Sequence, residues 1–419
     1  MSEQSKGGRI FPLRPGGVGG SPGSGRRRKE PPKGRRAVTV AVWSAAALVV
    51  VGGSGLGYVY LKLDGNLKSV DINAQLGTDR PKNVDNGSMD ILVLGSDSRS
   101  GDNGAYGKDE GGARSDTAMV VHVYEGHKKA SVVSIPRDTL VERPSCTDGR
   151  GKAVPRERRA MFNTAYEVGG PACAVKTVES MSGIRMDHYI EVDFSGFKKL
   201  IDKLGGVEIT TTKAIKDSKS HLDLEPGTHT LDGEQSLGLV RTRKSVGDGS
   251  DLGRIQLQQA FMKAFIDQVK DVGVFTNPKK LLDVADTATK AITPDSELDS
   301  VNELMGFAQG LSGLGAEDVH MVTMPVEYDP ADPNRVIPLE APSRQVWQAL
   351  KADRPIPASA TKDAATGQAD GVVGPPATAY GIVSPGTRFW EIRPVLADWY
   401  VGPGSRRCNP HGDPEPSRN

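Results

Sequence analysis

The sequence predicts an α/β fold in which one sheet is covered by helices on both faces, with a single membrane-spanning segment before it. From residue 89 to about 355, short β-branched runs of strand length alternate with apolar stripes at helical spacing. A stretch of 25 residues without a charged side chain, residues 37–61, precedes this region. The region from 89 to 355 is long enough to bury a substantial core.

The N-terminal segment predicts how the chain is placed in the membrane. Residues 1–36 hold ten Lys or Arg, two Glu and many Gly and Pro, which is typical of a disordered tail. As a helix, residues 37–61 would extend roughly 37 Å, enough to cross a bilayer. Basic residues before the span predict a cytoplasmic N-terminus and an extracytoplasmic domain, hence a single-pass protein of the cell membrane. Small residues at 52–55 resemble a signal-peptidase site, but the length of the span favours an uncleaved signal anchor.

The charge balance excludes one class of partner. The formal net charge of the whole chain is only +1, so there is no general positive field to attract a nucleic acid. The basic tail is therefore interpreted as a determinant of membrane topology. Residues 62–88 are polar and predict a linker to the folded region.

The elements of the folded region follow from the spacing of apolar residues. Strands are expected at 90–94, 117–124 and 131–135, and another begins at Val207. A further strand is expected over 184–194, where alternate residues share one face: Ile184, Met186, Ile190, Val192 and Phe194. Helices are expected from Pro171 to Gly183, from Phe197 to Gly205, over 252–271, and near 278–290, 297–312 and 343–351.

The remainder of the chain, residues 356–419, is rich in Ala, Gly and Pro and predicts a low-complexity tail. An aromatic patch stands out in this tail, at Phe389, Trp390, Trp399 and Tyr400. Cys146 and Cys173 lie 27 positions apart in the domain predicted to be extracytoplasmic, where oxidation is permitted. A disulfide between them would stabilise the fold by about 3 kcal/mol, and two unpaired thiols are the alternative.

Two aspartates are placed so that they could meet at one edge of the sheet. Asp97 follows the strand 90–94, and Asp116 precedes the strand 117–124. If these strands pair as neighbours in a hairpin, the end of one lies beside the start of the next. Two carboxylates together with substrate phosphates are a common way to hold Mg²⁺. Taken singly, each residue is more readily interpreted as a loop or capping aspartate than as a metal ligand.

Arginines gather at the boundaries of the same elements. Arg137 follows the third strand, Arg241 and Arg243 would share one face of an extended segment, and Arg254 and Gln258 lie one helical turn apart. Guanidiniums bind phosphate oxygens in bidentate geometry, and clustered arginines repel one another unless an anion is bound. Arginines with carboxylates therefore predict a site for a phosphate ester or a pyrophosphate. The chain has no P-loop motif, and its seven histidines lack the spacing of a zinc site.

The order of the motifs resembles the LytR-CpsA-Psr family of cell-wall ligases over roughly residues 89–355. The segments that carry the resemblance are LVLGSDSR, ARSDT, SIPRDT, FNTAYEVGGPAC, GIRMDHYIEVDFSGFKKLIDKLGGVEI, LDGEQSLGLVRTRK and the GD…GRIQLQQ stretch at 247–259. The resemblance implies an α-β-α sandwich around a central mixed sheet, with a hydrophobic tunnel beneath the sheet for a lipid tail.

The resemblance also implies an activity. A phosphoglycosyl polymer would pass from a polyprenyl-pyrophosphate carrier to a hydroxyl of peptidoglycan, so that an anionic glycopolymer such as wall teichoic acid becomes attached to the cell wall. Mg²⁺ or Mn²⁺ would be held by Asp97 and Asp116. The pyrophosphate would be bound by Arg99, Arg114, Arg137, Arg241, Arg243, Arg254 and Gln258. Arg114, Arg137 and Asp138 would take part in catalysis, with Asp138 supporting Arg137 or acting as the base.

One departure from the family pattern concerns the phosphate site. Many members have a lysine two residues before the asparagine of the N-x-A-Y motif, and this position is Met161 here. Arg158 or Arg159 is the expected substitute. Two other functions stay open from the sequence, namely a pyrophosphatase that uses water as the acceptor and a non-catalytic surface protein that binds the lipid carrier or has a regulatory role.

Overall fold

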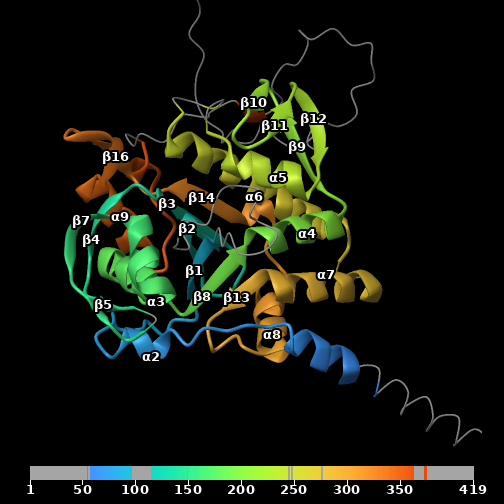
Figure 1. The fold of residues 1–419 in the computed structure, drawn as a ribbon, viewed down its shortest axis with the longest axis horizontal. Coiled ribbons are helices and arrows are strands. Elements are labelled where there is room, and N and C mark those ends of the chain that lie inside the picture. The colour runs from blue at the N-terminus through green and yellow to red at the C-terminus, as the bar shows by residue number, and fades with distance from the viewer. Residues whose placement is uncertain are drawn as a thin grey trace, which may run out of the picture. The chain divides into compact units, whose positions relative to one another are not determined.

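A computed structural model describes residues 54, 57–96, 115–148, 150–243, 246, 249–274, 277–362 and 372–374 (Figure 1). The chain divides into two units, Met1–Gly65 and Asn66–Asn419. In the first unit, residues 57–64 are helical. None of the helices within the described residues is both long and apolar enough to cross a bilayer. Most of the predicted anchor, residues 37–61, lies outside the described residues.

A six-stranded sheet forms the centre of the second unit. Its strands are β1 (Met89–Ser96), β2 (Ser115–Val123), β3 (Ala130–Ile135), β8 (His188–Asp193), β13 (Ile292–Pro294) and β14 (Val319–Thr323), in the order β13-β8-β1-β2-β3-β14. β2 is antiparallel to both β1 and β3, and β13 is antiparallel to β8. β8 runs parallel to β1, and β14 runs parallel to β3. The predicted α/β fold with a central mixed sheet is therefore confirmed.

Helices cover the two faces of this sheet because successive strand residues point to opposite sides. Leu92 and Leu94 of β1 belong to a core that includes residues of α2 (Asn73–Leu76), α3 (Phe162–Ser182) and α9 (Glu340–Lys351). Ile91 and Val93 of the same strand belong to a second core with residues of α6 (Asp251–Asp271) and α8 (Val301–Leu311). The result is three layers, helix, sheet and helix (Figure 1).

A third core lies in a smaller lobe that packs against the middle of α6. Its elements are α4 (Phe194–Leu204), β9 (Val207–Thr211), β10 (Ile215–Asp217), β11 (Leu222–Leu224), β12 (Gly227–Leu231) and α5 (Gly233–Arg241). α7 (Pro278–Ala291) packs against α4 so closely that a side chain at Gly196 would collide with Ala291. From the predicted C-terminal tail, β17 (Val373–Gly374) adds a strand to β9. The aromatic patch of that tail lies outside the described residues.

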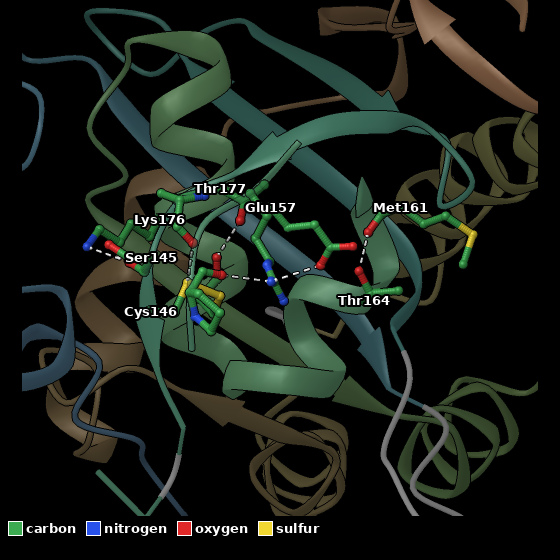
Figure 2. Close-up of a disulfide and its surroundings, with 11 residues drawn as sticks. Ser145, Cys146, Glu157, Met161, Thr164, Lys176 and Thr177 are labelled. Carbon is green, nitrogen blue, oxygen red and sulfur yellow. Dashed lines mark hydrogen bonds and ion pairs between the residues drawn. A yellow bond between two sulfur atoms is a disulfide. The ribbon is translucent and has the colours of Figure 1, made fainter. Parts of the chain in front are cut away.

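Short hairpins lie beside α3. They are formed by β4 (Leu140–Arg143) with β7 (Glu157–Met161), β5 (Cys146–Thr147) with β6 (Ala153–Val154), and β15 (Val326–Asp329) with β16 (Asp332–Pro338). Two short 3₁₀ helices, η2 (Ala316–Asp318) and η3 (Ala358–Ala360), occur elsewhere in the described residues. A disulfide joins Cys146 of β5 to Cys173 of α3 (Figure 2). Next to it, Lys176 donates a 2.9 Å hydrogen bond to the carbonyl of Ser145. The disulfide thus fastens the β5–β6 arm to the helix layer.

The strand expected over 184–194 is shorter in the structure. Gly183 has a φ of +67°, which ends α3 in the left-handed conformation. Met186 is buried, but its backbone N–H donates to the carboxylate of Glu179 and its carbonyl accepts from Arg80, so neither group joins the ladder. At the other end, Asp193 accepts hydrogen bonds from two backbone N–H groups and caps α4, so Phe194 belongs to a helix.

The helix expected to start at Pro171 begins instead at Phe162. Gly170 has a φ of +64° and interrupts α3 at this point, so Pro171 lies in the first turn of the second half of the helix. Pro171 therefore marks the start of the second half of α3 correctly, but the prediction that the whole helix begins there is wrong.

His122 of β2 predicts a pH-dependent stability. Its ring nitrogens lie 2.8 Å from Asp90 and 3.0 Å from Asp353. An ionised carboxylate only accepts hydrogen bonds, so a ring that is protonated at both nitrogens fits this position. Burial alone would lower the pKa of His122, but the two carboxylates outweigh it and raise the pKa. This stabilisation is complete below the unfolded pKa of about 6.5 and is lost as the pH rises through the folded pKa.

We therefore expect the free energy of unfolding to fall as the pH rises above about 6.5, and to fall less steeply in His122→Asn. Denaturant titrations at pH 6, 7 and 8 measure this. His188, whose pKa is raised beside Asp295, accounts for the slope that remains in the variant. The exposed His320→Asn serves as control and should follow the wild type. Parallel curves for the wild type and His122→Asn would contradict the assignment.

Candidate functional site

The ends of three neighbouring strands bring the predicted site residues to one edge of the sheet. β1 and β2 are antiparallel, and Ser96 pairs with Ser115 at the last step of their ladder. The residues that precede Asp97 and Asp116 in the chain therefore lie opposite each other. β3 is antiparallel to β2, so Arg137, two residues beyond the end of β3, reaches the same edge. Asp97, Arg99 and Arg114 themselves lie outside the described residues.

Three guanidiniums and two carboxylates meet at this edge. Arg137 forms an ion pair with Asp116 and lies 3.7 Å from Asp251, which is in the first turn of α6. Asp251 also pairs with Arg254 and lies 3.6 Å from Arg243. Arg254 donates a 2.9 Å hydrogen bond to the backbone carbonyl of Asp116. These five residues, called the arginine cluster below, carry one more positive charge than negative.

The charges in the cluster change the acidity of its members. Burial by itself would raise the pKa of Asp116, but the three guanidiniums of the cluster outweigh it and lower the pKa. Burial would lower the pKa of Arg137, whereas Asp116, Asp251 and Asp138 raise it. Burial and the two neighbouring guanidiniums lower the pKa of Arg243 to about 10. The cluster therefore holds positive charges at the cost of mutual repulsion, and a bound anion would relieve this repulsion.

The other two predicted ligands of the pyrophosphate lie beside the cluster. Arg241 is the last residue of the helix α5, whereas Arg243 lies beyond the end of this helix. The prediction that Arg241 and Arg243 share one face of an extended segment is therefore wrong. The guanidinium of Arg241 lies over the ring of Phe194, 5.7 Å from its centre. Gln258 donates hydrogen bonds to the hydroxyl of Thr117 and to the carbonyl of Val240, at 3.0 and 2.9 Å.

Gln258 and Thr117 also line an apolar cavity of about 100 Å³ under the sheet. The cavity is bounded by β1, β2 and β8 on one side and by α4, α5 and α6 on the other, and its other lining residues are Val93, Gly95, Met119, Val192, Phe194, Phe197, Leu237, Val240, Phe261 and Met262. Polar groups occur where it approaches the arginine cluster, and aromatic and aliphatic groups line the rest. This is the arrangement expected for a ligand with a charged head and an apolar tail.

Asp138 lies between two arginines. One of its oxygens is 3.6 Å from Nε of Arg137, and the other is 3.6 Å from a terminal nitrogen of Arg335 in β16. Arg159, one of the two expected substitutes for the missing lysine, pairs with Asp329 at 2.6 Å. Met161 lies at the end of β7.

The sequence did not reveal two of these residues. Asp251 is not among the predicted site residues, although its spacing of three from Arg254 in a first helical turn is a usable signal for an ion pair. Arg335 comes from a hairpin almost two hundred residues away from Asp138, and no local pattern connects them.

The described residues offer few ligands to a divalent cation. No group of three His, Cys, Asp or Glu side chains that could hold a metal occurs among them. Asp116 is the one predicted metal ligand within the described part of the chain, and its lowered pKa keeps a hard oxygen ligand ionised. One ionised carboxylate fits a cation that takes its other ligands from Asp97 and substrate phosphates.

The arginine cluster predicts the effect of removing its shared carboxylate. In Asp251→Asn, three buried or half-buried guanidiniums lose a counter-charge, which should lower the free energy of unfolding by about 3 kcal/mol. Inorganic pyrophosphate should raise the melting temperature of this variant more than that of the wild type. Asp223→Asn removes an exposed carboxylate paired with Lys216 and should cost less than about 1 kcal/mol. Equal losses in the two variants would contradict the role of Asp251.

Comparisons with known proteins agree with this geometry. The model of the LytR-CpsA-Psr family matches residues 59–352. The cell wall biosynthesis protein LcpA of Corynebacterium glutamicum is 34% identical over 316 residues, which are 68% of this chain and 59% of LcpA. The chain thus spans less than two thirds of the length of LcpA. The polyisoprenyl-teichoic acid–peptidoglycan teichoic acid transferase TagT of Bacillus subtilis is 32% identical over 317 residues, which are 73% of this chain and 91% of TagT.

Solved structures show the same fold. The LytR-Csp2A-Psr enzyme from Actinomyces oris has a TM-score of 0.50 at 22% identity, and the match covers 68% of this chain and 95% of that enzyme. TagV of B. subtilis has a TM-score of 0.50 at 25% identity, covering 64% of this chain and 98% of TagV. With a family match over residues 59–352, this chain belongs to the LytR-CpsA-Psr family.

Proposed function

We propose that this chain transfers a phosphoglycosyl polymer from a polyprenyl-pyrophosphate carrier to a hydroxyl of peptidoglycan, and so attaches an anionic glycopolymer to the cell wall. The observation that carries the proposal is the arginine cluster beside an apolar cavity. A pyrophosphate on an isoprenoid chain has the same two parts, a compact anion and an apolar tail. The relationship to a named teichoic acid transferase supports the same reaction.

The arginine cluster would bind the donor and stabilise the leaving group. Planar guanidiniums match pairs of phosphate oxygens, and their excess charge attracts a pyrophosphate. As the acceptor hydroxyl attacks the phosphorus next to the sugar, a new P–O bond forms and the bond to the bridging oxygen breaks. Negative charge then develops on the polyprenyl phosphate that leaves, where Arg137 and its neighbours stabilise it. The anhydride supplies its own activation, so no ATP is needed.

The proton of the attacking hydroxyl needs an acceptor. Asp138 lies next to Arg137, on the side of the cluster that faces Arg335, and its carboxylate is assigned this proton. Mg²⁺ or Mn²⁺, held by Asp116 together with Asp97, would neutralise further charge on the pyrophosphate. Membrane anchorage through residues 37–61, with the catalytic domain outside the cytoplasm, would place the site beside the lipid carrier.

Replacing Arg137 should remove transition-state stabilisation without unfolding the protein. In Arg137→Gln, acceptor-dependent release of polyprenyl phosphate should fall by roughly 100- to 1000-fold, the usual effect of losing one donor to a developing charge. The assay uses the purified full chain in detergent, with Mg²⁺, a polyprenyl-pyrophosphate-linked glycopolymer and peptidoglycan. The matched control is Arg156→Gln, which removes an exposed ion pair with Glu142 and should keep full activity.

Three outcomes separate the candidate functions. Release that requires peptidoglycan and is lost in Arg137→Gln supports the transferase. Equal release with and without peptidoglycan would instead identify a pyrophosphatase. Binding of the donor with no release under either condition would leave a carrier-binding protein.

Filling the apolar cavity should weaken the binding of the donor selectively. Met262 of α6 is half-buried and lines the cavity, so Met262→Trp places a larger ring where the isoprenoid would lie. The KM for the donor should rise at least tenfold, while the KM for peptidoglycan stays within twofold. Met305→Trp, at an exposed position on α8, is the control. An unchanged donor KM in Met262→Trp would show that the lipid binds elsewhere.

A further inference from the structure

A second concavity opens on the other side of Asp138. This groove has a volume of about 620 Å³ and lies between the β4–β7 hairpin, the first two turns of α3 and the turn that joins β15 to β16. It is lined by Leu140, Glu157, Arg159, Ala160, Met161, Thr164, Glu167, Val168, Asp329, Ala331, Asp332 and Arg335. Met161 and Thr164 stand side by side in this wall, where the hydroxyl of Thr164 donates to the carbonyl of Met161 (Figure 2).

The groove is continuous with the arginine cluster. Arg335 lines the groove and lies 3.6 Å from one oxygen of Asp138, whose other oxygen lies 3.6 Å from Arg137. Backbone hydrogen bonds also connect the start of α3 to the segment Arg137–Thr139, which contains Asp138. The N–H of Asn163 donates to the carbonyl of Arg137 at 3.1 Å, and that of Phe162 donates to the carbonyl of Thr139 at 2.9 Å. A molecule in the groove therefore ends beside Asp138.

One feature of the wall is typical of a binding site. Arg159 has a φ of +55°, a conformation that costs energy for a residue with a side chain, and its ion pair with Asp329 holds it there.

The charges of the groove differ in sign from those of the arginine cluster. Its lining holds four carboxylates, from Glu157, Glu167, Asp329 and Asp332, against the two guanidiniums of Arg159 and Arg335. Arg143, which lies outside the lining, pairs with Glu157 and reduces the excess to one negative charge. Both guanidiniums are already paired with carboxylates. An anionic polymer would be repelled here. Hydroxyl and amide N–H groups, in contrast, can donate to carboxylates.

The remaining lining of the groove is apolar. Leu140, Ala160, Met161, Val168 and Ala331 offer aliphatic surface next to the carboxylates. Methionine in particular adapts its shape to a ligand. Sugars with N-acetyl groups combine hydroxyl and amide donors with methyl groups, and so match both parts of the lining. The residue that departs from the family pattern, Met161, thus contributes contact surface to this groove.

We propose that this groove binds the neutral, N-acetylated sugar strand of the acceptor and presents its hydroxyl to Asp138. The inference rests on the proposed transferase function and adds to it the place and the chemistry of the second substrate. The two substrates would approach Asp138 from opposite sides, the anionic donor over the arginine cluster and the uncharged acceptor strand along the groove.

Direct binding tests the groove without any reaction. The full chain in detergent is titrated with chitotetraose, a neutral tetramer of N-acetylglucosamine, by calorimetry. Ala331→Trp, in an exposed turn, and Glu167→Trp, at an exposed helical position on the opposite wall, should each weaken binding at least tenfold. Arg344→Gln on α9 is the control and should bind as the wild type does. Inorganic polyphosphate should not displace the tetramer. The absence of binding, or equal affinities in wild type and both groove variants, would overturn the proposal.

Transfer kinetics separate this proposal from the proposed function. In Ala331→Trp the KM for peptidoglycan should rise at least tenfold while the Kd of the donor stays within twofold. An unchanged KM for peptidoglycan in both tryptophan variants, with transfer intact, would overturn the groove alone. Chitotetraose binding that is lost in both variants, without acceptor-dependent release in the wild type, would overturn the transferase and leave a glycan-binding groove.

Discussion

The arrangement of the site depends on one carboxylate that several guanidiniums share. Asp251 contacts Arg137, Arg243 and Arg254, which come from the end of a strand, from the chain beyond α5 and from α6. Without a common counter-charge, these three cations would separate. With it they stay together, partly withdrawn from water, where their attraction for an anion is less screened. The site is thus organised before any substrate arrives, and the cost of gathering the cations is met during folding.

The sheet supplies the geometry in which this carboxylate can act. Because β2 is antiparallel to both of its neighbours, the end of β1, the start of β2 and the end of β3 share one edge. The helix α6 then crosses the face of the sheet and brings Asp251 and Arg254 in its first turn to that edge, with Gln258 one turn further on. The same helix forms one wall of the apolar cavity. A single element therefore fixes the distance between the charged head site and the apolar space.

Much of this could be predicted from the sequence, since local patterns carry it. The apolar runs located β1, β2 and β3, and hairpin pairing placed the neighbours of Asp97 and Asp116 together. The prediction failed where tertiary contacts decide the backbone. Residues 184–187 alternate like a strand, yet Glu179 and Arg80 take the hydrogen bonds of Met186. Arg241 was expected in an extended segment. It is instead the last residue of the helix α5, which begins after the capping box at Asp232. Arg335 was not foreseen, since only the folded chain brings it to Asp138.

The break in α3 bears on how far the wall of the groove can move. At Gly170 the helical hydrogen-bond pattern is interrupted, so the helix is two rods in series. The second rod is held by the disulfide at Cys173 and by the core beneath the sheet. The first rod carries one wall of the groove and is held by Phe162, which is buried in the same core as the second rod, and by Tyr166, whose hydroxyl donates to Glu191. A displacement of this wall would have to draw Phe162 out of the core, so the groove keeps its width when a polymer enters it.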